Sequence, residues 1–237
     1  MKIDNKREIF EYEGQLFDHI AAMYWHSKGF EAYWQNARRE LVEKALKQLR
    51  INCESVLDVG CAEGYFVAYA RKLGYRAIGF DLARSKLRKG DNLGAVGDAQ
   101  TLPLADRSMD IVMFNRVLEY VPDDQLALQE AARVGRRYLV ITVPVGGLEQ
   151  ILQYSWGLKR RSYEPNSFQT ILEQYGRVVQ ISGVGVLGFI PKFWRLFVWL
   201  KLYSLPGFQA LDMSLARKKR LLPFVHELFV VVEIMTR

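Results

Sequence analysis

The sequence is poor in the residues that define several protein classes. Its 237 residues include only two cysteines, Cys53 and Cys61, and three histidines. Two cysteines are too few for a disulfide-stapled domain, and no Cys/His group has zinc-site spacing, so we expect no metal. The first ten residues lack an apolar core followed by small residues, unlike a secretory signal, so we expect a cytoplasmic protein.

Long hydrophobic runs are also missing. The most apolar stretch, residues 189–201, mixes five aromatic side chains with Lys192, Arg195 and Lys201. It is too short and too charged to cross a bilayer. Three interpretations remain open for it: a core helix, the lining of an apolar substrate pocket, or a segment in a membrane interface.

Acidic residues are scarce in the C-terminal part of the chain, where basic residues outnumber them. Residues 1–150 hold 21 Lys/Arg and 21 Asp/Glu, whereas residues 151–237 hold 12 and 5, so the net charge of +7 belongs to the C-terminal part. An anionic partner should therefore bind there. Residues 151–222 also hold three of the five tryptophans, which favours a hydrophobic acceptor and peripheral contact with an anionic membrane through residues 186–220.

Short apolar runs alternate with helical patterns along the chain. Strand-like runs occupy residues 55–59, 76–80, 95–96, 110–115, 138–143, 178–181 and 227–235, and helical patterns occupy residues 65–73, 82–89, 122–134 and 166–175. This alternation predicts a doubly wound α/β fold, a Rossmann-like, mostly parallel, seven-stranded sheet with helices on both faces. We expect residues 1–50 to form a helical cap of two helices. Residues 51–237 should form a ligand-binding domain with a helical insertion at about 186–222.

The segment from Asp58 to Gly64 follows the first strand and precedes a helix. Glycines there let the backbone approach a ligand closely, at the strand ends where open parallel sheets bind ligands. A dinucleotide fingerprint starting at Gly60 fails at Ala62 and Tyr65, and a phosphate-binding P-loop is absent. A carboxylate before the first glycine suits a cationic ligand better than a pyrophosphate. S-adenosylmethionine, a sulfonium with an ammonium group and no phosphate, has this character.

Three further motifs follow at the ends of the next strands. Asp81 comes directly after the second strand, where an acidic residue can accept both ribose hydroxyls. Asp98 and Ala99 follow the third strand, where a carboxylate beside small apolar residues suits an adenine ring. The strand ending at Asn115 should lie beside the transferred methyl group.

Four segments together resemble the class I S-adenosylmethionine-dependent methyltransferases, especially the branch with quinone-biosynthesis and other small-molecule or lipid enzymes. They are VLDVGCAEG (56–64), GFD (79–81), GDAQTLPLAD (97–106) and DIVMFNRVLEYVPD (110–123). The resemblance implies a donor site built from Asp58, Gly60, Cys61, Ala62, Gly64, Asp81, Leu82, Asp98, Ala99, Asn115 and Arg116.

The sequence departs from this family at positions that bear on catalysis. Tyr120 stands where many relatives have a histidine, and Ala62 replaces a common glycine. No catalytic residue can be assigned; His26 and Tyr120 are the candidates for a base. We expect a methyltransferase acting on a small-molecule or lipid-like acceptor. The alternatives are an RNA or protein methyltransferase using the basic C-terminal surface, although no specific nucleic-acid motif is present, and a non-catalytic donor-binding module.

Overall fold

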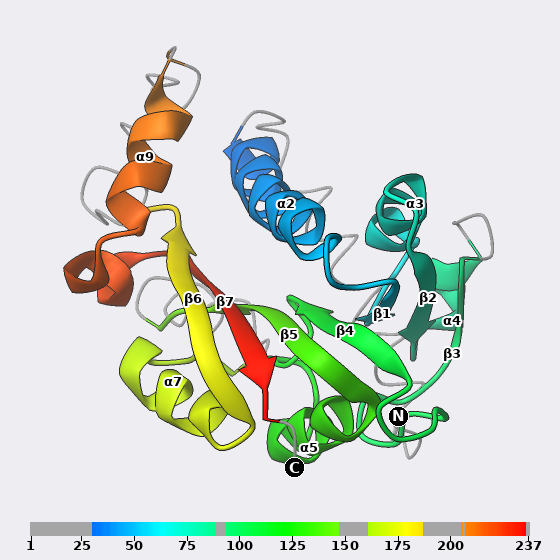
Figure 1. The fold of residues 1–237 in the computed structure, drawn as a ribbon. Coiled ribbons are helices and arrows are strands. Elements are labelled where there is room, and N and C mark those ends of the chain that lie inside the picture. Colours follow the sequence, from blue (N-terminus) through cyan, green and yellow to red (C-terminus); the bar gives the residue numbers. More distant parts are fainter. Residues whose placement is uncertain (1–29, 89–92, 147–160, 187–204, 206, 236–237) are drawn as a thin grey trace, which may run out of the picture.

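The architecture comes from a computed structural model, which describes residues 30–88, 93–146, 161–186, 205 and 207–235 (Figure 1). The strands are β1 (Ser55–Val59), β2 (Arg76–Asp81), β3 (Gly94–Val96), β4 (Met109–Asn115), β5 (Gly135–Pro144), β6 (Gly176–Val184) and β7 (Glu227–Ile234). The helices are α2 (Phe30–Leu49), α3 (Tyr65–Lys72), α4 (Arg84–Leu87), α5 (Asp124–Val134), α7 (Pro165–Glu173) and α9 (Phe208–Ala216), with the 3₁₀ helix η3 (Lys219–Phe224).

The seven strands form one sheet in the order β3-β2-β1-β4-β5-β7-β6. The five strands from β3 to β5 pair in parallel, while β7 runs antiparallel to both β5 and β6. The strand order reverses between β1 and β4, which places a ligand-binding crevice at their carboxyl ends. The predicted doubly wound, mostly parallel sheet is confirmed.

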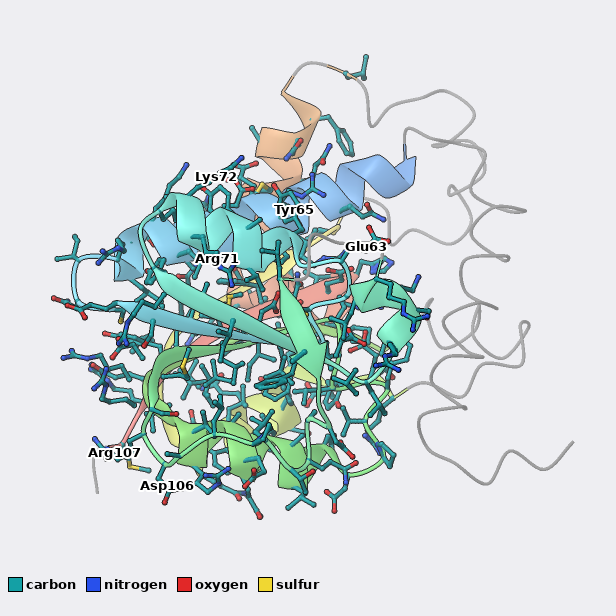
Figure 2. All side chains as sticks on the ribbon, turned by 90° about the vertical axis from the view of Figure 1, so that its right-hand side faces the viewer. Glu63, Tyr65, Arg71, Lys72, Asp106 and Arg107 are labelled. Carbon is teal, nitrogen blue, oxygen red and sulfur yellow. The ribbon has the colours of Figure 1, made fainter. Side chains whose placement is uncertain are left out.

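Helices cover both faces of this sheet and bury two apolar clusters against it. One cluster joins the sheet to α5 and α7, and the other joins it to α2, α3 and α9. Figure 2 shows α3, with Tyr65, Arg71 and Lys72 labelled, on the side of the sheet opposite to α5. Strands buried on both faces read as continuous apolar runs, and all five residues of β1 are buried accordingly.

Local sequence signals explain where several helices begin and end. The Asp123 side chain accepts a hydrogen bond from the Leu126 backbone N–H and so caps α5. Gly74 follows α3 with a positive φ of 86°. Glu164 caps α7 by accepting hydrogen bonds from the backbone N–H groups of Asn166 and Ser167.

Some boundaries differ from the prediction. Strand β6 was predicted at residues 178–181. In the structure it begins earlier, at Gly176, and continues to Val184. Pairing with β7 along its whole length explains the extension, because ladder hydrogen bonds override the weak local pattern. Helix α4 begins at Arg84 instead of residue 82.

The predicted cap elements are described only in part. Helix α2 packs against β5, β6, α3 and α9, and both α9 and η3 lie between β6 and β7 in the chain. The first predicted helix, His26 and the aromatic stretch 189–201 lie outside the described residues. Among the helices that are described, none is long and apolar enough to span a membrane.

Candidate functional site

A cavity of about 310 Å³ opens at the carboxyl ends of β1, β2 and β4. This volume lies at the lower end of the range for small-molecule sites, roughly 300–1,000 Å³. Its lining residues are Val59, Gly60, Ala62, Asp81, Leu82, Ala83, Lys86, Gly97, Asp98, Ala99, Arg116, Val117, Tyr120, Val121 and Pro122. Seven of the residues that the sequence predicted for the donor site therefore meet at one cavity.

The loop between β1 and α3 is shaped by residues with positive φ. Gly60 has φ 75°, and a Cβ atom there would lie 2.2 Å from the Val117 side chain, so only glycine fits. The Gly60 and Cys61 backbone N–H groups donate to the Phe80 carbonyl, which ties the loop to β2. Ala62 has φ 47°, an unfavourable conformation for any residue with a side chain.

Asp81 joins this loop to the end of β2. Its Oδ2 atom accepts a hydrogen bond from the Ala62 backbone N–H, and its Oδ1 atom accepts one from Ala83, both at 2.8 Å. Burial raises the pKa of this carboxyl above its usual value, while the two backbone hydrogen bonds oppose that rise. Because each carboxylate oxygen has two lone pairs, both oxygens can accept a further hydrogen bond from a ligand.

Asp58 is the most deeply buried carboxyl group of the site. It is 1% exposed, and within the described ranges its Oδ1 atom has no hydrogen-bond partner. Burial, together with the nearby Asp81 charge, raises its pKa to about 8. A buried carboxyl with an unpaired oxygen is rare and calls for a partner, such as a ligand cation.

Asp98 and Ala99 lie at the start of the loop that follows β3. The Gln100 backbone N–H donates to Asp98 Oδ1, and Ala99 is buried in the core. Arg133 on α5 fixes the rest of this loop by donating to the carbonyls of Leu102 and Leu104 at 3.0 and 2.8 Å. The loop therefore presents Asp98 to the cavity from a rigid support.

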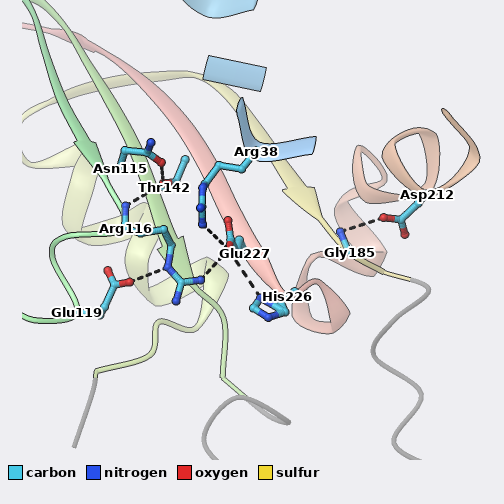
Figure 3. Close-up of polar contacts among 9 residues, drawn as sticks. All are labelled: Arg38, Asn115, Arg116, Glu119, Thr142, Gly185, Asp212, His226 and Glu227. Carbon is cyan, nitrogen blue, oxygen red and sulfur yellow. Dashed lines mark hydrogen bonds and ion pairs between the residues drawn. The ribbon is translucent and has the colours of Figure 1, made fainter. Parts of the chain in front are cut away.

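A buried ionic network lies beside the cavity (Figure 3). Arg116 donates from Nε to Glu119 Oε1 at 2.6 Å and from Nη1 to Glu227 Oε1 at 2.8 Å. Arg38 on α2 donates to the same Glu227 oxygen at 2.8 Å. The Arg116 backbone N–H bonds to the Thr142 hydroxyl, which in turn donates to Asn115 Oδ1. Arg116 is thus fixed at its backbone and at its guanidinium group.

Four predicted site residues do not line the cavity with the others: Asp58, Cys61, Gly64 and Asn115. The Cys61 thiol is buried against Gly79 and Gly94, and burial raises its pKa, so the side chain is a packing group. Of the two candidate bases, Tyr120 lines the cavity and His26 lies outside the described residues.

Sequence reasoning missed Lys86, Arg38 and Glu227. Lys86 sits in a helix too short to show a pattern, and Arg38 is one of many charged residues on α2. Glu227 could have been predicted as a functional or paired residue from the sequence, since it begins a mostly apolar terminal strand. A charge at the start of a buried strand is expected to find a partner.

Comparison with known proteins agrees with this site. Residues 57–139 match the family described as "Methyltransferase domain". The chain is 32% identical over 106 residues to the malonyl-[acyl-carrier protein] O-methyltransferase of Hamiltonella defensa, and 35% identical over 106 residues to that of Serratia marcescens. Residues 57–139 thus carry a methyltransferase domain, and these matches support the resemblance to the class I S-adenosylmethionine-dependent methyltransferases. Both matches cover 41% of this chain, which spans only about two fifths of the length of these relatives, 41% and 42%.

Solved methyltransferase structures share the fold over most of the chain. The magnesium protoporphyrin IX methyltransferase of Synechocystis PCC 6803 with bound SAH superposes with a TM-score of 0.66, at 12% identity, covering 98% of this chain and 100% of that one. A methyltransferase from Archaeoglobus fulgidus gives a TM-score of 0.59 at 18% identity, covering 88% and 99%. The family match ends at residue 139, so it includes the cavity loops and excludes β6 and β7.

Proposed function

We propose that this chain transfers a methyl group from S-adenosylmethionine to a small-molecule or lipid-like acceptor. The observation that carries the proposal is the carboxylate-lined cavity at the glycine loop, with Asp81 and Asp98 on its wall and Asp58 buried behind the loop. This arrangement suits a cationic nucleoside without phosphate. It does not suit a dinucleotide, because the glycine pattern of dinucleotide-binding loops fails at Ala62 and Tyr65.

The contacts of each residue support a separate role. Asp81 holds the loop through two backbone hydrogen bonds and keeps lone pairs for the ribose hydroxyls. Asp98 and Ala99 would contact the adenine ring. Asp58, with its unpaired buried oxygen, would bind the ammonium group of the methionine part, and Arg116 would lie near the methyl group.

The chemistry requires alignment more than it requires acid–base groups. The donor supplies a methyl group on a sulfonium, which leaves readily in an in-line displacement. Holding the acceptor in line with the methyl group can supply about 7–11 kcal/mol of the barrier reduction. An acceptor that binds in its protonated form also needs a base, and Tyr120 is the described candidate at the cavity wall.

Two observations support the proposed acceptor class. The curated relatives are named for a carrier-bound acyl group, which fits a small or lipid-like acceptor. At the C-terminal side, Arg217, Lys218, Lys219 and Arg220 are all exposed, and Leu211 and Phe224 are 54% and 48% exposed. Basic and apolar side chains together suit an anionic lipid surface, so we include peripheral membrane contact in the proposal.

Calorimetry tests the donor assignment. Purified protein should bind S-adenosylmethionine and its demethylated product with micromolar or tighter affinity, and it should not bind NAD. Incubation with donor labelled in the methyl group and cell extract should then label an organic-soluble or small molecule. Tight NAD binding without donor binding would refute the proposal.

A further inference from the structure

A row of polar side chains crosses one face of the sheet at its carboxyl end. Asp58 on β1 pairs with Met113, and Asn115, two residues further on, pairs with Thr142 on β5. Thr142 in turn pairs with Phe229 on β7, two residues from Glu227. Side chains two apart on a strand share a face, as do paired residues, so this polar row lies on one face.

The row continues onto β6. Glu227 pairs with Val184, and Ser182 lies two residues before Val184 on the same face. The face is the one that α2 covers, because Phe229 and Val184 pack in the same cluster as α2. An apolar sheet face is thus interrupted by one line of polar groups, beside the cavity and beneath α2.

Three atoms in this row are buried without a hydrogen-bond partner among the residues that the structure describes. They are Asp58 Oδ1, Ser182 Oγ and Glu227 Oε2. Ser182 and Glu227 are each 3% exposed. Leaving a buried polar atom unpaired destabilises a protein, so such atoms in one line indicate a ligand that pairs with them.

Only one of the two Glu227 carboxylate oxygens accepts hydrogen bonds from the described side chains. Oε1 accepts hydrogen bonds from both Arg38 and Arg116, and His226 Nδ1 lies 3.9 Å from it. Despite complete burial, the two arginines hold the pKa of Glu227 below its usual value. An ionised carboxylate only accepts hydrogen bonds, so the group that meets Oε2 must be a donor.

Glu227 lies beside the proposed donor cavity. Arg116 lines that cavity and touches Glu227, so one guanidinium group separates the two sites (Figure 3). We propose that Glu227 and Ser182 bind the acceptor, and that they take a hydroxyl or amine group carried beside the methylated atom. The inference rests on the proposed methyltransferase function and adds the chemistry of its acceptor. A carboxylate in this position is disfavoured, because it would face the Glu227 charge in a buried environment.

Ser182→Ala is the most informative variant. Its hydroxyl makes no hydrogen bond to the described part of the chain, so its removal should leave the melting temperature unchanged or raised. Binding of the demethylated donor product, measured by calorimetry, should also stay unchanged. Label transfer from the donor into a dilution series of cell extract should need about five- to tenfold more extract for half-saturation, the effect of one lost hydrogen bond. Val179→Ala, an exposed position on the same strand, should match the wild type throughout.

Glu227→Gln gives a second reading. It keeps the shape and should raise the half-saturating extract concentration about ten- to a hundredfold, as expected for lost charged hydrogen bonds. Because it also disturbs Arg38 and Arg116, Ser182→Ala decides the matter. A Ser182→Ala protein that labels extract as the wild type does at every dilution overturns the subsite while leaving the methyltransferase function intact. A wild-type protein that binds the product but labels nothing overturns the function and the subsite together.

Discussion

Replacing Asp81 with alanine should weaken ligand binding and also destabilise the loop between β1 and α3. The variant loses two charge-assisted hydrogen bonds of 2.8 Å, to the Ala62 and Ala83 N–H groups, together with the proposed ribose contacts. Hydrogen bonds to a charged group contribute about 1.5–3 kcal/mol. Affinity for the demethylated donor product should therefore fall ten- to a hundredfold or more, and the free energy of unfolding should fall by about 1–3 kcal/mol.

Glu164 offers a matched control for that variant. Its carboxylate also accepts two backbone hydrogen bonds, from Asn166 and Ser167, but at the start of α7 and away from the cavity. Glu164→Ala should lower stability slightly, through the lost helix cap, and leave the dissociation constant unchanged. Calorimetry and denaturant unfolding measure both quantities. If folded Asp81→Ala binds the product with wild-type affinity, Asp81 does not contact the ligand and the reasoning fails.

Three other outcomes follow from the site. Because the pKa of Asp58 is raised to about 8, the folded protein retains a proton that the unfolded chain loses near pH 4, so stability should fall as pH rises from about 4 through 8. Thermal melts of Asp58→Asn should lack this component, and an identical pH profile would contradict the assignment. Ala62→Gly should raise the free energy of unfolding by about 1 kcal/mol, since φ 47° strains alanine; a loss of stability would contradict that reasoning. Lys218→Glu with Lys219→Glu should weaken salt-sensitive co-sedimentation with anionic liposomes, by about 1 kcal/mol or more per residue, and the absence of wild-type binding would remove the membrane contact.

The fold was largely predictable because its strands are buried on both faces. Residues 55–59 and 110–115 form continuous apolar runs ended by glycine or polar residues, and the structure places β1 and β4 there within one residue. The loop between β1 and α3 was predictable for a related reason. Gly60 adopts a positive φ that favours glycine, and a glycine at the end of a strand is visible in the sequence. Such signals depend on neighbours in the chain and need no knowledge of distant contacts.

The ionic network around Glu227 was not predictable in the same way. Arg38, Arg116 and Glu227 are 78 and 111 residues apart along the chain, and only the pairing of β5 with β7 and the packing of α2 bring them together. The contribution of Asp81 to the loop conformation was also hidden, since its hydrogen bond to Ala62 depends on how the loop folds back over β2. Long-range pairing therefore determines the parts of the site that local patterns leave open.

Methyl transfer itself is the most direct test of the account. Purified protein is incubated with S-adenosylmethionine labelled in its methyl group and with cell extract, and the products are analysed by mass spectrometry. We expect one labelled small or lipid-like molecule bearing a hydroxyl or amine, formed in equal amount to the demethylated donor and reduced in Asp81→Ala at donor concentrations near the wild-type dissociation constant. Label found only on RNA or on amino-acid side chains of proteins, or donor binding without any labelled product, would contradict it.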